Sequence, residues 1–328
     1  MAGIETRYLY PPADIHMRVP DDVRKCVVFL GKEVGVEKVY GGTAFVVGIS
    51  SKTTPLHFMY LVTAKHCADA LDGIDFWVRF NSKSGGVLEL KTNSNARWFR
   101  HPVDPDHVDV AVLPFLYQPD IDAAYVNLYS FYAKALAPSI GTGDDVFITG
   151  LFALAKGTQR NMPIIRMGNI AMMPDDKIPV KKFGEIDCYL IEARSTGGVS
   201  GSPVFVRETL VANPSDSQDD VHGVSGKFWL LGLMNGHWDI DPATLNEVTV
   251  RGVDAGVNLG IAIVVPAYKI VEVLRHPELV EMRKHIEGEW TASQETSKLD
   301  TAFPPNKEKT FTKEDFETAL KKVSRKTK

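Results

Sequence analysis

The stretch Ser195-Thr-Gly-Gly-Val-Ser-Gly-Ser-Pro-Val-Phe205 places Ser200 in a glycine-rich turn directly before an apolar strand. A serine hydroxyl becomes an effective nucleophile only when a base takes its proton and backbone N–H groups receive the oxyanion that forms. The flanking glycines allow backbone conformations that aim two N–H groups at one point. The same residues also suit an ordinary turn between strands. The choice depends on whether a histidine and an aspartate occur upstream in suitable contexts.

A histidine occurs in such a context in Leu61-Val-Thr-Ala-Lys-His66-Cys67, where an apolar strand runs directly into His66. The imidazole is then expected at a strand end beside a cleft, and its near-neutral pKa suits general acid–base catalysis. The alternative is a structural or surface histidine. Among the nine histidines, His66 is favoured by its context, with Gly42-Thr-Ala-Phe-Val46 upstream and a helix-like segment downstream.

A carboxylate begins the apolar strand Asp109-Val-Ala-Val-Leu-Pro114. Burying such a group is costly unless it is hydrogen-bonded, and the N–H of a histidine ring would satisfy it. The alternative is a strand-start carboxylate in water, and Asp104 and Asp106 are nearby competitors. Only Asp109 lies directly against the apolar strand, so we predict that Asp109 orients His66.

Short β-branched and aromatic runs, separated by Gly, Asn, Ser or Pro, predict a sheet-rich fold with hairpin connections. One set of runs lies between residues 25 and 113, and a second between 145 and 265. Residues 120–137 fit either a connecting helix or a linker with aromatic anchors. Helical spacing follows Pro266, residues 288–310 are polar and expected to be flexible, and Thr312-Lys-Glu-Asp315 is typical of a helix start.

The order His66, Asp109, Ser200 resembles that of the chymotrypsin/trypsin-like serine protease family, in particular a bacterial-type, non-secreted trypsin-like peptidase domain. The resemblance covers about residues 25–275. It is carried by Gly42-Thr43, Val62-Thr63-Ala64-x-His66-Cys67, Asp109-x-Ala111-x-Leu113, Gly198-x-Ser200-Gly201-x-Pro203, Gly232-Leu233 and Leu259-Gly260-Ile261.

The resemblance implies an all-β fold of two antiparallel six-stranded β-barrels with a C-terminal helix. The expected divisions are an N-terminal extension (1–24), a peptidase domain (25–287) and a flexible tail with a short basic helix (288–328). Within the peptidase domain we expect a first barrel at about 25–118, a second at about 140–265, and closing helices at 266–287.

The resemblance also implies a role for each site residue. Ser200 would be the nucleophile, His66 the base and then the acid, and Asp109 the orienting carboxylate. The N–H groups of Gly198 and Ser200 would form the oxyanion hole. Substrate-binding residues would be Arg194, Asn235, His237 and Gly260, with the strand at 234–237 pairing with the substrate backbone. At the base of the specificity pocket, Arg194 would favour an acidic substrate side chain; alternatively, it pairs with Glu185 or Glu192.

The chain departs from the family pattern at three positions. Cys67 lacks the usual disulfide partner, because no cysteine lies near Tyr40. Val199 replaces the acid that captures a newly cut N-terminus in trypsin, so activation by such cleavage is not expected. Ser202 replaces a glycine. With Val199 beside the nucleophile, whether the resting site is assembled stays open.

Composition narrows the remaining classes of function. A net charge of −4 gives no reason to expect nucleic-acid binding, and no run approaches the eighteen or so apolar residues of a membrane helix. Three scattered cysteines are too few for a disulfide framework or a metal site, and no metal or cofactor is expected. The first thirty residues lack the apolar segment of a signal peptide, so we expect a cytoplasmic protein.

Three functions remain in competition. The first is a serine endopeptidase that acts on protein or peptide substrates through an acyl-enzyme. The second is a catalytically latent or inactive trypsin-like fold that acts as a protein-binding module, with the C-terminal tail as a possible docking segment for a protein partner. The third is an esterase-like hydrolase with the same triad. A complete His-Asp-Ser set favours the endopeptidase.

Overall fold

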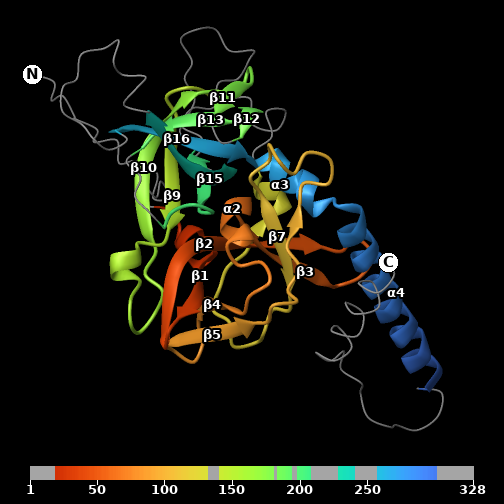
Figure 1. Cartoon of the computed structure of the whole chain (residues 1–328). Helices are drawn as coiled ribbons and strands as arrows, with labels where there is room; N and C mark the ends of the chain where they lie inside the picture. Colours follow the sequence, from red (N-terminus) through yellow and green to blue (C-terminus); the bar gives the residue numbers. More distant parts are fainter. Residues whose placement is uncertain are drawn as a thin grey trace, which may run out of the picture.

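The computed structural model describes residues 19–131, 140–180, 183–193, 198–207, 228–240 and 257–300, with the side chains of residues 129, 237–240, 257–259 and 295–300 excepted. Two β-rich halves lie against each other, with the short helix α2 between them and the long helix α4 along one side (Figure 1). The sequence-based prediction of an all-β fold with C-terminal helices is therefore confirmed.

The first half is an eight-stranded sheet in which β5, β4, β1, β2, β3, β7 and β6 are neighbours in that order and β8 pairs in parallel with β2. Its strands are β1 (Val27–Val34), β2 (Glu37–Ser50), β3 (His57–Thr63), β4 (Phe76–Asn81), β5 (Val87–Thr92), β6 (Phe99–Arg100), β7 (Ala111–Phe115) and β8 (Val126–Asn127). A closed six-stranded barrel was expected here. Within the described residues the sheet stays open, because β5 and the two-residue strand β6 end it and do not pair with each other.

The second half is a closed barrel of six strands in the order β10, β13, β16, β15, β14 and β9, as the sequence predicts. Its strands are β9 (Asp145–Gly150), β10 (Ile164–Met172), β13 (Tyr189–Glu192), β14 (Pro203–Arg207), β15 (Phe228–Ile240) and β16 (Val257–Pro266). A small hairpin of β11 (Ile178–Val180) and β12 (Gly184–Ile186) is an addition that the sequence analysis did not anticipate.

The first part of β1, from Val27 to Leu30, is a continuous apolar run, and both of its faces are covered. Along β1, Val27 and Phe29 belong to the core shared with the barrel and the C-terminal helices, whereas Val28 and Leu30 belong to the core inside the first sheet. Successive side chains of a strand point to opposite faces, so a strand buried on both sides needs apolar residues at every position. The shared core makes the two halves one packing unit.

The helices are α1 (Asp21–Lys25), α2 (Lys65–Asp69), α3 (Ala267–Leu274) and α4 (Pro277–Asp300), with 3₁₀ turns at Leu128–Ser130 and Ala153–Ala155. The closing helices expected at 266–287 are present as α3 and α4. However, α4 continues to Asp300, so residues 288–300 are helical where a flexible tail was expected. No connecting helix forms over the described part of 120–137, which holds β8 and a 3₁₀ turn. The helix expected at Thr312 and the remaining tail lie outside the described residues.

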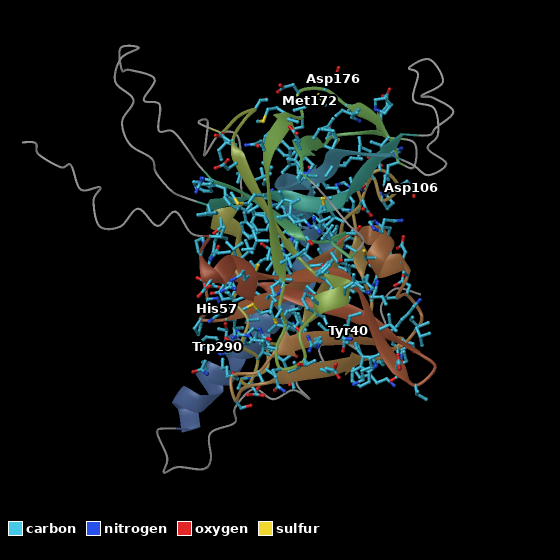
Figure 2. The ribbon with its side chains drawn as sticks, turned by 90° about the vertical axis from the view of Figure 1, so that its left-hand side faces the viewer. Tyr40, His57, Asp106, Met172, Asp176 and Trp290 are labelled. Carbon is cyan, nitrogen blue, oxygen red and sulfur yellow. The ribbon has the colours of Figure 1, made fainter. Side chains whose placement is uncertain are left out.

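The two ends of the molecule are marked by labelled side chains in Figure 2. Met172 and Asp176 lie at the end formed by the barrel, and Tyr40, His57 and Trp290 lie in the other half, where α4 runs (Figure 2). Between the ends, Leu151 and Leu233 of the barrel, Val62 of the sheet and Ile270 of α3 share one buried cluster. The boundary between the halves is thus packed, and the candidate site lies along it.

Candidate active site

Three elements bring His66, Asp109 and Ser200 to the boundary between the halves. His66 is the second residue of α2, which begins directly after β3, and Asp109 lies two residues before β7. Since β3 and β7 are paired neighbours, their ends lie side by side. Ser200 lies in the turn that precedes β14 of the barrel. The sheet therefore supplies the histidine and the aspartate, and the barrel supplies the serine.

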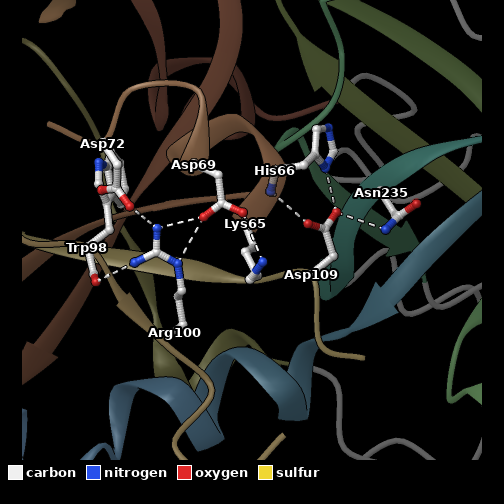
Figure 3. A network of polar contacts seen from close by, with 8 residues as sticks. All are labelled: Lys65, His66, Asp69, Asp72, Trp98, Arg100, Asp109 and Asn235. Atoms are coloured by element: carbon white, nitrogen blue, oxygen red, sulfur yellow. Dashed lines mark hydrogen bonds and ion pairs between the residues drawn. The ribbon is translucent and has the colours of Figure 1, made fainter. Parts of the chain in front are cut away.

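The carboxylate of Asp109 is buried and accepts three hydrogen bonds (Figure 3). Oδ1 accepts from the backbone N–H of His66 at 2.9 Å, and Oδ2 accepts from Nδ1 of His66 at 2.8 Å and from Nδ2 of Asn235 at 2.8 Å. A buried carboxylate is tolerated when its oxygens are satisfied in this way. The prediction that Asp109, and neither Asp104 nor Asp106, contacts His66 agrees with these contacts.

The environment of His66 stabilises its charged form. Burial disfavours the imidazolium, but the hydrogen bond to Asp109, the adjacent Cys67 side chain and the nearby Asp109 charge outweigh burial and raise the pKa of His66 to about 10. These contacts therefore favour the protonated form of His66 in this conformation. A protonated imidazole cannot accept the Ser200 proton, so the base becomes competent as His66 loses its proton.

Asn235 reaches Asp109 because the strand that carries it is irregular. In the pairing of β15 with β16, Met234 lies opposite Val264 and Gly236 lies opposite Ile263, so Asn235 is the extra residue of a bulge. Bulges next to active sites commonly re-aim a side chain. The Asn235 side chain, only 6% exposed, turns to the carboxylate of Asp109.

The Ser200 hydroxyl donates to the carbonyl oxygen of Asn235 at 3.2 Å, and this is its acceptor among the described residues. The expected hydrogen bond from Ser200 to His66 is thus not formed in this conformation. Catalytic hydrogen bonds are often long or absent without substrate, and rotation about the Cα–Cβ bond of Ser200 is enough to move its Oγ. The structure therefore joins His66 to Asp109 by hydrogen bonds, whereas the Ser200 hydroxyl bonds to the Asn235 carbonyl oxygen.

The turn around Ser200 is shaped by two glycines in the left-handed region, Gly198 with φ +98° and Gly201 with φ +83°. At Gly201 a Cβ would lie 2.2 Å from the carbonyl oxygen of Thr43 and 2.3 Å from Oγ1 of Thr63, so only glycine fits. The turn packs directly on the end of the first sheet.

Thr43 joins the two halves through one hydroxyl. Its Oγ1 donates to the carbonyl oxygen of Gly198 at 2.8 Å and accepts from the N–H of Leu151 at 2.9 Å. Its N–H also donates to the carbonyl oxygen of Ser200 at 3.4 Å. This residue of β2 therefore holds the serine turn of the barrel from the sheet side.

The N–H groups proposed as the oxyanion hole are available. Gly201 N–H donates to Met234 O at 2.9 Å and Ser202 N–H to Val199 O at 3.0 Å. In contrast, no acceptor is assigned to the N–H of Gly198 or of Ser200 within the described part of the chain. Both residues are half-buried. Two free donors beside a nucleophile can stabilise a developing oxyanion.

Of the four predicted substrate-binding residues, the structure describes the side-chain surroundings of only Asn235 and Gly260. Arg194 and the side chain of His237 lie outside the described part, although the His237 backbone pairs with Ala262 in the barrel. Gly260 has open space where a Cβ would project, consistent with a lining position. The Asn235 side chain is buried against Asp109, so only its backbone is left to meet a substrate. Substrate binding by these residues stays a prediction.

Ion pairs fix the helix that carries His66. Asp69 of α2 pairs with Lys65 at 2.8 Å and with Arg100 of β6 at 2.6 Å, and Arg100 also pairs with Asp72 (Figure 3). Arg100 donates in addition to the carbonyl oxygen of Trp98. The fork of one guanidinium thereby holds both ends of the segment 69–72 to the sheet.

The described residues form neither a metal cluster nor a helix that could cross a membrane. No three His, Cys, Asp or Glu side chains there are grouped closely enough to hold a metal ion. None of the described helices combines the length and apolar character that crossing a bilayer requires.

No family model matches the chain, and no curated protein matches it. Solved structures that resemble it include the MamO protease domain of Magnetospirillum magneticum (17% identity, 76% of this chain and 96% of that chain, TM-score 0.45) and the Rv3671c protease of M. tuberculosis in an inactive form (17% identity, 78% and 90%, TM-score 0.43). A third is the HtrA-type protease AlgW with a decapeptide (15% identity, 80% of this chain and 66% of that chain, TM-score 0.43).

At these identities and TM-scores the likeness adds nothing about activity or substrate. The class that the sequence predicts, a trypsin-like protease fold, agrees with what the described residues form by themselves. They give an all-β architecture, a closed barrel that presents Ser200, and a sheet that presents His66 and Asp109. We therefore base the proposed function on the geometry of these residues.

Two contributors to the site were missed from the sequence. Gly42-Thr43 was noted as a motif, but the bridge from its threonine to Gly198 and Leu151 was not foreseen. Asn235 is predicted to bind substrate, but in the structure its side chain donates to the carboxylate of Asp109. The available signal was its polarity: Asn235 follows the apolar run from Phe228 to Met234, where a buried amide needs a partner.

Proposed function

We propose that this chain is a serine endopeptidase that cleaves peptide bonds through an acyl-enzyme formed on Ser200. The observation that carries the proposal is the buried carboxylate of Asp109, which holds His66 at 2.8 Å beside a serine turn with two free N–H groups. These are the parts that acyl transfer requires: a nucleophile, an oriented base and donors for the oxyanion.

In the proposed reaction, neutral His66 takes the proton of Ser200 through Nε2 while Oγ attacks the substrate carbonyl carbon. The negative charge that develops on the carbonyl oxygen is met by the N–H groups of Gly198 and Ser200. His66 then gives its proton to the leaving amine, and the C–N bond breaks. Water then attacks the ester carbonyl carbon as His66 takes one of its protons. The C–Oγ bond breaks, His66 returns that proton to Ser200 Oγ, and the acid product leaves.

The proposed substrate is a protein or peptide bound in an extended conformation. The backbone of β15 at 234–237 would pair with it, and Gly260 leaves space for the side chain before the cut. Arg194 is the proposed determinant of preference for an acidic side chain there. Charge reversal in Arg194→Glu should change that preference in profiled cleavage, and an unaltered profile would remove Arg194 from the pocket.

The first test is labelling with a fluorophosphonate probe at neutral and alkaline pH. Wild type should be labelled, and Ser200→Ala and His66→Ala should not. Ser202→Ala is the matched control, because Ser202 is a buried serine two residues away with no hydrogen-bond partner for its hydroxyl among the described residues. Equal labelling of wild type and Ser200→Ala would exclude Ser200 as the nucleophile.

A second candidate is a latent or inactive protein-binding module. It is favoured by one observation: the Ser200 hydroxyl donates to the carbonyl oxygen of Asn235 instead of His66. Folded wild-type protein that stays unlabelled at every pH would support this module and overturn the endopeptidase proposal. Comparing peptide with ester substrates at equal concentration separates the endopeptidase from an esterase-like hydrolase.

A further inference from the structure

A cavity of about 260 Å³ lies between the first sheet and the C-terminal helix, away from the serine turn. It is formed by the beginning of β3, the end of β7 and the middle of α4, and its walls are mostly apolar. The side chains that the proposal uses are Phe58, Tyr60, Phe115, Leu116, Met282 and Ile286. His57, at the start of β3, also lines it and lies in the half of the molecule along which α4 runs (Figure 2).

One lining residue, Arg283, is a cation that has no counter-ion among the described residues. Nη1 of Arg283 donates to the hydroxyl of Tyr60 at 2.8 Å, and Nη2 donates to the carbonyl oxygen of Leu274 at 3.0 Å. Both acceptors are neutral, and no carboxylate forms an ion pair with Arg283 in the part of the chain that the structure describes. A half-buried charge with only neutral partners retains unused donors and an unbalanced field, both of which an anion would satisfy.

The hydroxyl of Tyr60 adds a second donor. Its oxygen accepts from Arg283, and its own proton has no acceptor among the described residues. Tyr60 is only 2% exposed, and burial raises its pKa against the opposing effect of Arg283, so the proton stays on the oxygen at neutral pH. A guanidinium and a phenol O–H in contact can hold the two oxygens of one carboxylate.

We propose that this cavity binds a small free monocarboxylic acid with an apolar body. Its carboxylate would lie on Arg283 and Tyr60, and its body against Phe115, Met282 and Ile286. The volume of 260 Å³ is at or below the lower end of pockets for drug-sized ligands, roughly 300 Å³, and selects a short acid. The proposal is independent of the proposed peptidase activity.

The test uses octanoate and octanamide, which share the apolar body and differ in charge. Octanoate should bind the full-length protein saturably at one site in isothermal titration calorimetry, and octanamide about tenfold more weakly or worse, because charge-assisted hydrogen bonds are lost. No saturable binding of octanoate, or equal binding of the two compounds, would overturn the proposal.

Variants locate the site. Arg283→Met should weaken octanoate binding about tenfold or more. Lys284→Met is the matched control, since Lys284 is the exposed next residue of α4 and does not line the cavity; it should bind like wild type. If Arg283→Met fails to fold, Leu116→Trp fills the cavity from a position 38% exposed, leaves Arg283 unchanged, and should also abolish binding. Wild-type affinity in folded Arg283→Met or in Leu116→Trp would place the ligand elsewhere.

Discussion

Asp109 holds His66 at two points, the backbone N–H through Oδ1 at 2.9 Å and Nδ1 through Oδ2 at 2.8 Å. The first contact fixes where α2 begins, and the second fixes the orientation of the ring within it. With Nδ1 donating to the carboxylate, Nε2 is the nitrogen left for the serine. One side chain thus sets both the position and the tautomer of the base.

Asp109→Asn should lower the rate of acyl-enzyme formation by about 10⁴-fold, because an amide nitrogen cannot accept from Nδ1 and favours the wrong tautomer. The measurement is the second-order rate constant of fluorophosphonate labelling. Asp106→Asn serves as the control, since Asp106 is an exposed carboxylate of the same loop. A comparable loss in Asp106→Asn would contradict the assignment of Asp109.

Labelling of the wild type should rise with pH across the neutral and alkaline range. The pKa of His66 is raised to about 10. Only the neutral imidazole can accept a proton from Ser200, and below the pKa this form is the minor one. The neutral fraction, and with it the rate, increases about tenfold per pH unit until the pH approaches 10. A rate that is already constant from pH 7 upward would show that His66 titrates near its ordinary pKa in the reacting protein.

Thr43→Val should slow labelling and destabilise the fold, whereas Thr43→Ser should resemble wild type. Valine keeps the shape of the side chain but removes the hydroxyl that bridges Gly198 and Leu151. The N–H of the fully buried Leu151 is then left without an acceptor, at a cost of about 1–3 kcal/mol. Urea denaturation measures the stability, and kcat against KM separates positioning of the turn from substrate binding. Equal behaviour of the valine and serine variants would deny the hydroxyl a role.

Arg79→Met should lower the free energy of unfolding by about 3 kcal/mol or more. Arg79 is 4% exposed and donates to Asn161 Oδ1 at 2.6 Å, to Gly157 O at 2.7 Å and to Lys156 O at 3.2 Å, so it fastens a barrel loop to the first sheet. Arg97→Met is the contrast: Arg97 pairs with Glu278 at the surface, where loss should cost about 1 kcal/mol or less. If urea denaturation gave similar losses of unfolding free energy for the two variants, Arg79 would not hold the barrel loop to the first sheet.

Local sequence patterns predict the strands and single out His66, Asp109 and Ser200 as candidates. Apolar runs such as Val27–Leu30 predict strands without reference to partners, and His66 and Asp109 were found because each lies beside such a run. These signals are local because a strand covered on both faces must be apolar throughout.

Features that depend on distant pairing could not be read in this way. The first sheet stays open because the two-residue strand β6 pairs with β7 and not with β5. Asn235 reaches Asp109 through a bulge that depends on the register of β15 with β16. The extension of α4 past residue 288 does have a local signal, because His285 and Glu289 have the i, i+4 spacing of helical side-chain pairs. In the structure their side chains pair at 3.1 Å.

The division of the site between sheet and barrel has a consequence for how the chain can be taken apart. His66 and Asp109 lie in the first half of the chain, within residues 19–131, and Ser200 lies in the second half, in the turn before β14. Neither piece contains a working half-site. If Ser200 is the nucleophile, its labelling requires both pieces to be associated, so labelling of co-expressed fragments would measure how well the shared core reassembles.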